Sequence, residues 1–286
     1  MAIELATKYA PYVDEVFTEQ SKLDLVTTNS FEFGEDAETV KIYKIGTAPM
    51  NDYGRRGPSG SNWSRYGEVE DLAAETESYK LSNDRSFTFV IDTLDKNETV
   101  MQLEASKALA RQLREVVIPE VDKNLYEVMA FRAGTKLELT EDEIDLETKI
   151  YDYIIDASEA LDSAKIPDTP RTLIVPPKTY RMMKKSKEII MATETGAAER
   201  KKGIIGFLDG CTVVKVSAEL LPEGCIFIMA YKNATIAPTK LANYKVHRDP
   251  PGISGDLVEG RIVYDAFVFD NRQKGIYYLG KKADEA

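Results

Sequence analysis

The sequence predicts an α+β protein in which one very long helix connects a strand-rich first part to an alternating β/α region. Between Glu98 and Arg132, apolar residues recur at steps of three and four, which is typical of a helix with one buried stripe. Before this segment, and again near the end of the chain, apolar and polar residues alternate over short runs that are typical of half-buried strands. The two patterns together indicate helices and strands in separate regions of the fold.

The composition is that of a folded, acidic chain. Its 286 residues are 43% hydrophobic, which is enough to bury a full core in one large domain or two modest ones. The formal charge of −11 argues against a protein that binds nucleic acid tightly by neutralising phosphates. Any DNA nearby is therefore enclosed by the protein or contacts it only weakly. No run approaches the roughly 18 apolar residues of a membrane helix, and residues 1–7 lack the pattern of a signal peptide. We therefore expect no membrane contact and synthesis in the cytoplasm.

The first part of the chain is predicted to be an arm followed by two strands around a long loop. Residues 1–38 have apolar residues too loosely spaced for more than a little helix. Residues 38–46 and 77–94 alternate apolar and polar side chains, which predicts strands. Between them, residues 47–76 carry four glycines and no apolar repeat, which predicts a long projecting hairpin loop.

This loop holds the one locally basic and aromatic segment of an acidic chain. Its candidate contact residues are Arg55, Arg56, Trp63, Arg65 and Tyr66. Guanidinium groups and aromatic rings suit docking to an acidic protein, and they also suit stacking on single-stranded nucleic acid. A solvated loop whose Trp folds back on its own domain is the third reading. The net charge favours an acidic protein partner, and another copy of this chain is such a partner.

The long helix is predicted to have one buried stripe and one bend. Pro119 lies inside the apolar repeat, where its missing N–H and its ring disturb helical hydrogen bonding, so we expect a kink there. At 1.5 Å per residue the helix spans on the order of 50 Å, more than a compact domain needs. The predicted stripe consists of Met101, Ala105, Leu109, Leu113, Val116, Val117, Val121, Leu125 and Val128.

The second half alternates strands and helices. Thr140 and Glu143 have the spacing of a capping box, which predicts a helix beginning there and burying Ile150, Ile154, Ala157 and Leu161. A short strand before two prolines and a basic helix follow. Residues 211–217 and 225–231 are expected to pair as a hairpin, with Cys211 and Cys225 too far apart to bond. Two closing strands, joined by a turn through Asn271 and Lys274, complete the chain.

No pattern indicates catalysis, a cofactor or a metal. The single histidine, His247, has no Cys or acidic cluster at ligand spacing, and we expect it on a loop or the surface. The glycines around Arg55 lack the strand, helix and Lys of a phosphate loop. Acid pairs such as Asp142 with Glu143 or Glu68 with Glu70 leave a carboxylate-based hydrolase as the less favoured alternative.

The order of these parts resembles the major capsid protein of tailed bacteriophages, the Hong Kong 97-like family. Three segments carry the resemblance: the return strand YKLSNDRSFTFVIDTLDKNET running into the long helix, DTPRTLIVPPKTY, and GDLVEGRIVYDAFVFDNRQKGIYYL. The resemblance implies an α+β capsid fold in five parts. They are an N-terminal arm (1–38), an extended-loop hairpin with flanking strands (39–97), a peripheral domain with a spine helix (98–170), a mixed α/β axial domain (171–258) and return strands of the peripheral domain (259–286).

The resemblance also implies a structural role, with hexamers and pentamers forming an icosahedral phage head, a virion component, around double-stranded DNA. The extended loop would then contact an adjacent subunit, and a loop near the capsomer axis would exchange charge with its copies through Glu194, Glu199, Arg200, Lys201 and Lys202. From the short segment ahead of the first strand we expect a separate scaffolding protein, besides a portal. We expect no covalent cross-link, because no motif brings Lys80 and Asn243 together. An encapsulin-like nanocompartment shell is the alternative within the same fold.

Overall fold

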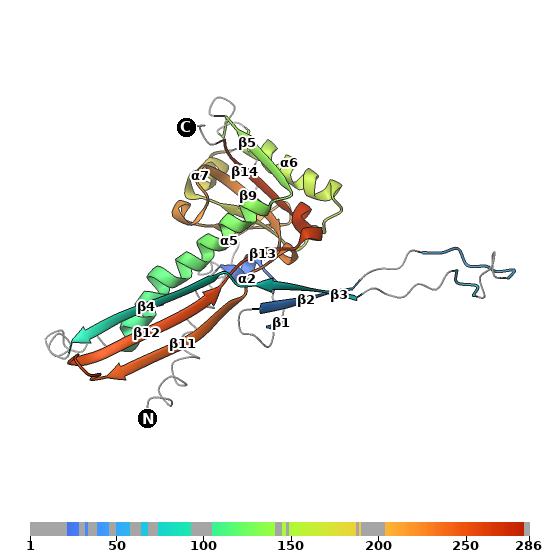
Figure 1. Ribbon diagram of the computed structural model, residues 1–286. Coiled ribbons are helices and arrows are strands. Elements are labelled where there is room, and N and C mark those ends of the chain that lie inside the picture. The colour runs from blue at the N-terminus through green and yellow to red at the C-terminus, as the bar shows by residue number, and fades with distance from the viewer. Residues whose placement is uncertain are drawn as a thin grey trace. The chain divides into compact units, whose positions relative to one another are not determined.

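The computed structural model separates into two compact units, one of residues 30–81 and one of residues 1–29 with 82–286. Each unit is described by itself, and Figure 1 labels their elements. The residues that the structure describes are 22–28, 32–33, 39–45, 50–57, 64–67, 74–92, 105–140, 145–146, 149–186, 189 and 204–282.

The smaller unit is built on an antiparallel sheet with the strand order β1-β2-β3. Thr39 lies opposite Lys80 and Ile45 opposite Ala74, so the two strands that flank the long loop pair as predicted. The predicted second strand is in fact two strands, because β3 ends before Leu81 and Ser82 and the chain then enters the larger unit. The bounds are Glu32–Phe33 for β1, Thr39–Ile45 for β2 and Ala74–Lys80 for β3.

The larger unit is organised around the predicted long helix, which is continuous from Ala105 to Arg132 in the described residues. At 1.5 Å per residue this length is about 42 Å. Its middle turn is a π-helix, in which the N–H of Ile118 donates to the carbonyl of Leu113, five residues earlier. Pro119 is the second residue of the following α segment, inside the continuous helix, where it has no N–H to donate. The three segments are α4 (Ala105–Gln112), the π turn (Leu113–Val117) and α5 (Ile118–Arg132).

The π turn changes which residues form the buried stripe. Val116 was expected inside, but its side chain is 46% exposed, and that expectation is wrong. A π turn holds one more residue than an α turn, so Val116 points outward while Val117, which was also predicted in the stripe, is buried. A kink at Pro119 stays a prediction, although π-bulges are among the recognised causes of helix bending. The stripe members whose burial is confirmed are Leu109, Leu113, Val117, Val121 and Leu125.

A three-stranded antiparallel sheet, in the order β11-β12-β4, lies along the first part of this helix (Figure 1). The register places Phe89 opposite Val258 and Phe87 opposite Gly260, so these residues share the face that packs against the helix. A Cβ at Gly260 would lie 2.3 Å from the Phe87 ring, which therefore crosses the strand only because that residue is glycine. The bounds are Asn83–Asp92 for β4, Thr239–Arg248 for β11 and Gly255–Tyr264 for β12.

A six-stranded mixed sheet, in the order β5-β14-β9-β6-β8-β7, lies beside α5. Strand β6 pairs with β8 in parallel and with β9 in antiparallel fashion, so the expected hairpin of residues 211–217 with 225–231 is wrong. The two closing strands, which the sequence predicted to be joined by a turn, belong to different sheets as β12 and β14. The bounds are Thr135–Leu139 for β5, Arg171–Val175 for β6, Ile204–Leu208 for β7, Cys211–Lys215 for β8, Cys225–Tyr231 for β9 and Ile276–Lys281 for β14.

Two helices cover one face of this sheet and the long helix covers the other. Alternate strand residues face the two layers: Leu173 and Val175 pack in the cluster with α6 and α7, while Ile174 packs in the cluster with α5. Helix α6 (Ile150–Ser163) buries the four predicted residues, but it begins at Ile150 without a side-chain cap. Thr140 lies in an irregular segment, so the predicted capping-box start is wrong. Helix α7 spans Pro177–Lys185.

Short elements complete the larger unit. The small helix α2 (Leu23–Val26) is anchored to the sheet layer, since Thr172 Oγ1 donates to the carbonyl of Leu25 at 2.8 Å. The two sheets are connected by the short strands β10 and β13, which pair with each other. A 3₁₀ helix at Asp270–Gly275 takes the place of the predicted turn. The remaining bounds are Thr235–Ile236 for β10, Phe267–Val268 for β13, and 3₁₀ helices at Ala218–Leu220, Lys232–Ala234 and Asp270–Gly275.

Candidate interaction surfaces

The described part of the long loop forms a compact tip, made of residues 50–57 and 64–67. The N–H of Gly54 donates to the carbonyl of Arg65 at 2.9 Å, which joins the two segments. A side chain at Gly54 would collide with the carbonyl of Gly57, so the tight turn requires glycine there. The rings of Tyr53 and Tyr66 meet edge to face with centroids 5.0 Å apart.

The loop tip exposes the residue types that the sequence singled out. Arg55, Arg56 and Arg65 are exposed, and Tyr66 is 78% exposed. The structure thus brings four of the five predicted contact residues together, while Trp63 lies outside the described residues. Tyr53, 51% exposed, was missed, although its place beside Gly54 and two arginines was the available signal. Large exposed aromatic and guanidinium groups are typical of contact surfaces.

The other predicted site residues are not brought to a described surface. The axis loop with Glu194, Glu199, Arg200, Lys201 and Lys202 lies outside the described residues. The acid pairs that suggested a hydrolase, Asp142 with Glu143 and Glu68 with Glu70, also lie outside them. His247 sits on β11 in the three-stranded sheet, half-exposed, with its Nε2 3.3 Å from a carboxylate oxygen of Glu259.

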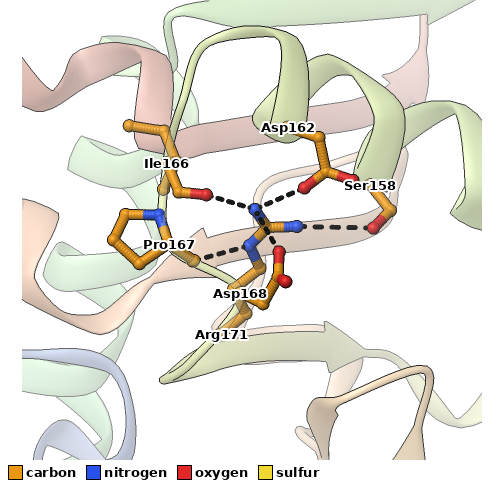
Figure 2. A network of polar contacts seen from close by, with 6 residues as sticks. All are labelled: Ser158, Asp162, Ile166, Pro167, Asp168 and Arg171. Carbon is orange, nitrogen blue, oxygen red and sulfur yellow. Dashed lines mark hydrogen bonds and ion pairs between the residues drawn. The ribbon is translucent and has the colours of Figure 1, made fainter.

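A buried arginine ties α6 to β6, as Figure 2 shows. Arg171 is 2% exposed, and its guanidinium donates at 2.6 Å to Asp162 Oδ1 and at 2.9 Å to the carbonyl of Pro167. The other partners are the carbonyl of Ile166 at 2.5 Å, Asp168 Oδ1 at 3.2 Å and Ser158 Oγ at 3.4 Å. Because the guanidinium of Arg171 donates hydrogen bonds to partners on several sides, it holds the α6–β6 connection in place. The sequence carried no signal for this network.

A groove of about 480 Å³ opens between α6 and the β7–β8 turn. Its floor is apolar, and Asp209 and Glu159 stand at its rim. Burial raises the pKa of the Cys211 thiol to about 11, although the charge of Arg171 acts in the other direction, so the thiol is protonated at neutral pH. A protonated thiol is a poor nucleophile. The carboxylate of Asp162, which also lines the groove, forms an ion pair with Arg171.

Among the described residues, the face of the three-stranded sheet turned away from the helix carries exposed charged side chains. The guanidinium of Arg261 donates two hydrogen bonds to the carboxylate of Asp84 on the neighbouring strand, and these bonds lower the pKa of the Asp84 carboxyl. Val90 is 48% exposed on this face. A shallow cavity of about 360 Å³ lies here, lined by Ser86, Phe87, Thr88, Lys245, Glu259, Gly260 and Arg261.

Within the ranges that the structure describes, no helix is both long and apolar enough to cross a membrane. In the same ranges, no three or more His, Cys, Asp and Glu side chains are grouped so that they would hold a metal ion.

No family model matches the sequence, and no curated protein matches it. Solved structures do match its fold. A chain from Mycobacterium phage Che8 is 18% identical, with a TM-score of 0.63 over 91% of this chain and 90% of that one. The capsid structure of the cyanophage P-SCSP1u is 12% identical, with a TM-score of 0.63 over 91% and 88%. A virus-like particle from Pyrococcus furiosus is 12% identical, with a TM-score of 0.55 over 96% and 99%. The chain therefore has the fold of phage capsid proteins, which confirms at the level of fold the resemblance expected from the sequence.

Proposed function

We propose that this chain is the major capsid protein of a tailed bacteriophage, assembling as hexamers and pentamers into an icosahedral head around double-stranded DNA. One observation carries the proposal: the likeness to phage capsid structures extends over about nine-tenths of both chains. A shared sheet or helix alone would match only part of each chain.

The loop tip is proposed as a contact with an adjacent subunit. Arginine forks bind carboxylates in two hydrogen bonds, and the chain carries a net charge of −11, so a second copy offers acidic partners. Changing Arg55 and Arg56 together to Glu should leave the monomer folded but lower the yield of assembled particles. Lys274→Glu with Lys282→Glu, which makes the same charge change at two exposed positions, is the matched control. Unchanged particle yield in the loop variant would refute the contact.

Two further parts of the assembly are proposed from the resemblance. The loop with Glu194, Glu199, Arg200, Lys201 and Lys202 would exchange charge with its own copies around the capsomer axis. A bend near Pro119 would let one sequence fit flat hexamers and curved pentamers. Helix angles that differ between the two capsomers would support this, and equal angles would count against it.

A separate scaffolding protein and a portal are the proposed assembly partners, with synthesis in the host cytoplasm. Contact with the enclosed DNA is weak and independent of base sequence.

The test is whether the purified full chain forms particles. Negative-stain microscopy and sedimentation should show closed shells or capsomer rings. A chain that stays monomeric at every concentration, alone and beside co-expressed scaffold, would overturn the proposal. Denaturing gels of the particles should show a single band of subunit mass, since no cross-link is expected, and a ladder of multimers would contradict that part.

An encapsulin-like nanocompartment is the second candidate. The likeness to the virus-like particle from Pyrococcus furiosus, which covers 99% of that chain, favours it. The two functions differ in what the particle contains. Particles isolated from the native host should protect long double-stranded DNA from nuclease if the chain is a phage capsid. A protein cargo in particles without DNA would favour the nanocompartment.

A further inference from the structure

The groove between α6 and the β7–β8 turn combines an apolar floor with an acidic rim. Leu208, Cys211 and Met229 at its floor are buried, and Ile155 on its wall is 43% exposed. The polar part of its lining includes three carboxylates, and none of the lining residues is a lysine, an arginine or a histidine. Such a groove suits a partner that brings an aromatic or apolar group together with positive charge.

The acids at the rim have charge left for a partner. Asp162, labelled in Figure 2, is paired with Arg171, and its side chain is still 56% exposed. Glu159 and Asp209 are exposed, and within the described part of the chain neither of them forms an ion pair. Because Arg171 is only 2% exposed, the charge that this rim presents to solvent is negative.

The loop tip offers the complementary groups. Arg55, Arg56 and Arg65 are exposed, and none of them forms an ion pair with another described residue. Tyr53 and Tyr66 are exposed as well, and their rings already hold each other edge to face. A segment that is ordered before it binds loses little conformational entropy on binding. The tip therefore carries, in one preformed segment, both kinds of group that the groove would accept.

We propose that the loop tip of one copy docks into this groove on an adjacent copy. This inference rests on the proposed shell function and names the surface that receives the loop. Tyr66, the more exposed of the two rings, enters over the apolar floor, and the arginines beside it bind the rim carboxylates through paired hydrogen bonds. The groove volume of about 480 Å³ lies within the range of pockets that hold small ligands, so it has room for an aromatic side chain.

The contact joins two different surfaces of the same chain. Contacts of this kind repeat from copy to copy and generate rings when the rotation closes. Exposed ion pairs contribute little one by one, so the aromatic ring supplies most of the affinity. The arginines instead fix the orientation of the tip and disfavour neighbours without an acidic rim.

The first test changes the rim charge in the full chain. The groove variant carries Glu159→Arg and Asp209→Asn; Asp209 has a φ of 46°, which Asn tolerates, so this position is neutralised and not reversed. Its assembled fraction in sedimentation should fall by about tenfold, because the rim then repels the tip. Asp152→Arg with Glu223→Gln makes the same charge change at exposed positions outside the groove and should assemble normally. An equal loss in this control chain would overturn the contact.

A chain with both surfaces changed gives a sharper outcome. It adds Arg55→Glu and Arg56→Glu to the groove variant, which restores opposite charges at the contact, and it should regain about half of the lost assembly. Failure to recover, in a chain whose melting by circular dichroism matches the wild type, would overturn the docking. If the groove variant melts early, Glu159→Gln with Asp209→Asn replaces it, with a smaller loss of assembly expected.

Cross-linking tests which part of the neighbour the tip reaches. A short bismaleimide should join a cysteine at the tip, Arg56→Cys, to one in the groove, Ile155→Cys, and give a ladder of multimers on a denaturing gel. The native Cys211 and Cys225 react slowly, because burial raises the pKa of these thiols to about 11 and about 12. Arg56→Cys with Glu223→Cys, which lies outside the groove, is the control and should give no ladder.

The outcomes separate this inference from the proposed function. A wild-type chain that forms no particles contradicts the shell function itself. Wild-type particles together with normal assembly of the groove variant overturn the docking and leave the shell function standing. A single band from the cysteine pair in assembled particles would mean that another segment fills the groove, and a faster-migrating monomer would mean that the tip lies in the groove of its own chain. Either result also overturns the contact between copies.

Discussion

The two sheets of the larger unit differ in how many of their faces are covered. In the six-stranded sheet, all five residues of β6 are buried, because α5 covers one face and α6 with α7 the other. In the three-stranded sheet, exposed and more buried residues alternate from Ser86 to Ile91 of β4, because among the described elements the long helix covers only one face. A sheet covered on both faces is a self-sufficient core, whereas a sheet with an open charged face has surface left for another molecule.

The largest expected effect comes from placing a charge in the doubly covered sheet. Ile228, which is fully buried on the α5 side, should not tolerate Asp, because an unpaired carboxylate there costs well over 4 kcal/mol. We expect the Ile228→Asp chain to be unfolded at room temperature by circular dichroism. Val90→Asp on the open face is the control, with an expected cost of about 1 kcal/mol from the poorer strand propensity of Asp. A cooperative, near-normal melt of Ile228→Asp would place that strand face outside the core.

The second effect tests the arginine that closes the α6–β6 connection. Arg171→Met should cost about 3 kcal/mol, because it removes the buried guanidinium and leaves carbonyl groups of the connection without donors. Urea unfolding monitored by fluorescence measures the change. Arg85→Met on the three-stranded sheet removes a surface ion pair with Glu120 and should cost at most about 1 kcal/mol. Equal midpoints for the two variants would mean that burial of Arg171 does not matter.

The third effect is a loss of stability at alkaline pH, to which the six-stranded sheet contributes. Burial raises the pKa of Cys225 and Tyr278 to about 12, from 9.0 and 10.0 respectively. The folded state then holds these protons more tightly than the unfolded state, so stability is complete below pH 9 and decreases as the pH rises towards 12. Urea midpoints measured from pH 7 to 11 should fall, and Cys225→Ala should reduce the slope. An identical slope in that variant would contradict the assignment.

The smallest effect is expected on the open face of the three-stranded sheet. Arg261→Gln breaks the cross-strand pair with Asp84, but both groups are about half exposed, and exposed pairs contribute little. The melting temperature should fall by about 2 °C or less, and the difference should vanish in 1 M salt. Lys123→Gln, which removes the exposed pair with Glu127 on α5, should behave alike. A larger, salt-independent loss would show that the open face contributes to the core.

Local patterns in the sequence predicted the long helix, the buried face of α6 and the β2–β3 hairpin around the loop. These features depend on contacts between residues a few positions apart, or on one period of apolar residues, and such patterns are visible along the chain. The loop tip was also predicted, because arginines and aromatic residues among glycines stand out in an acidic chain. The Che8 and cyanophage structures then supported the order of parts at the level of fold.

Only the tertiary structure decided which strands pair in the six-stranded sheet. Strands β8 and β9 are close in sequence, yet β6 lies between them, and β14 pairs with β5 from the other half of the chain. Each of these strands is a short apolar run that fits several neighbours equally well, so pairing depends on packing over the whole sheet. Dependence on distant packing also explains why the burial of Arg171 and the exposure of Val116 could not be predicted from the sequence. A buried cation and an outward valine are set by the α6–β6 connection and by a π turn, which no local pattern records.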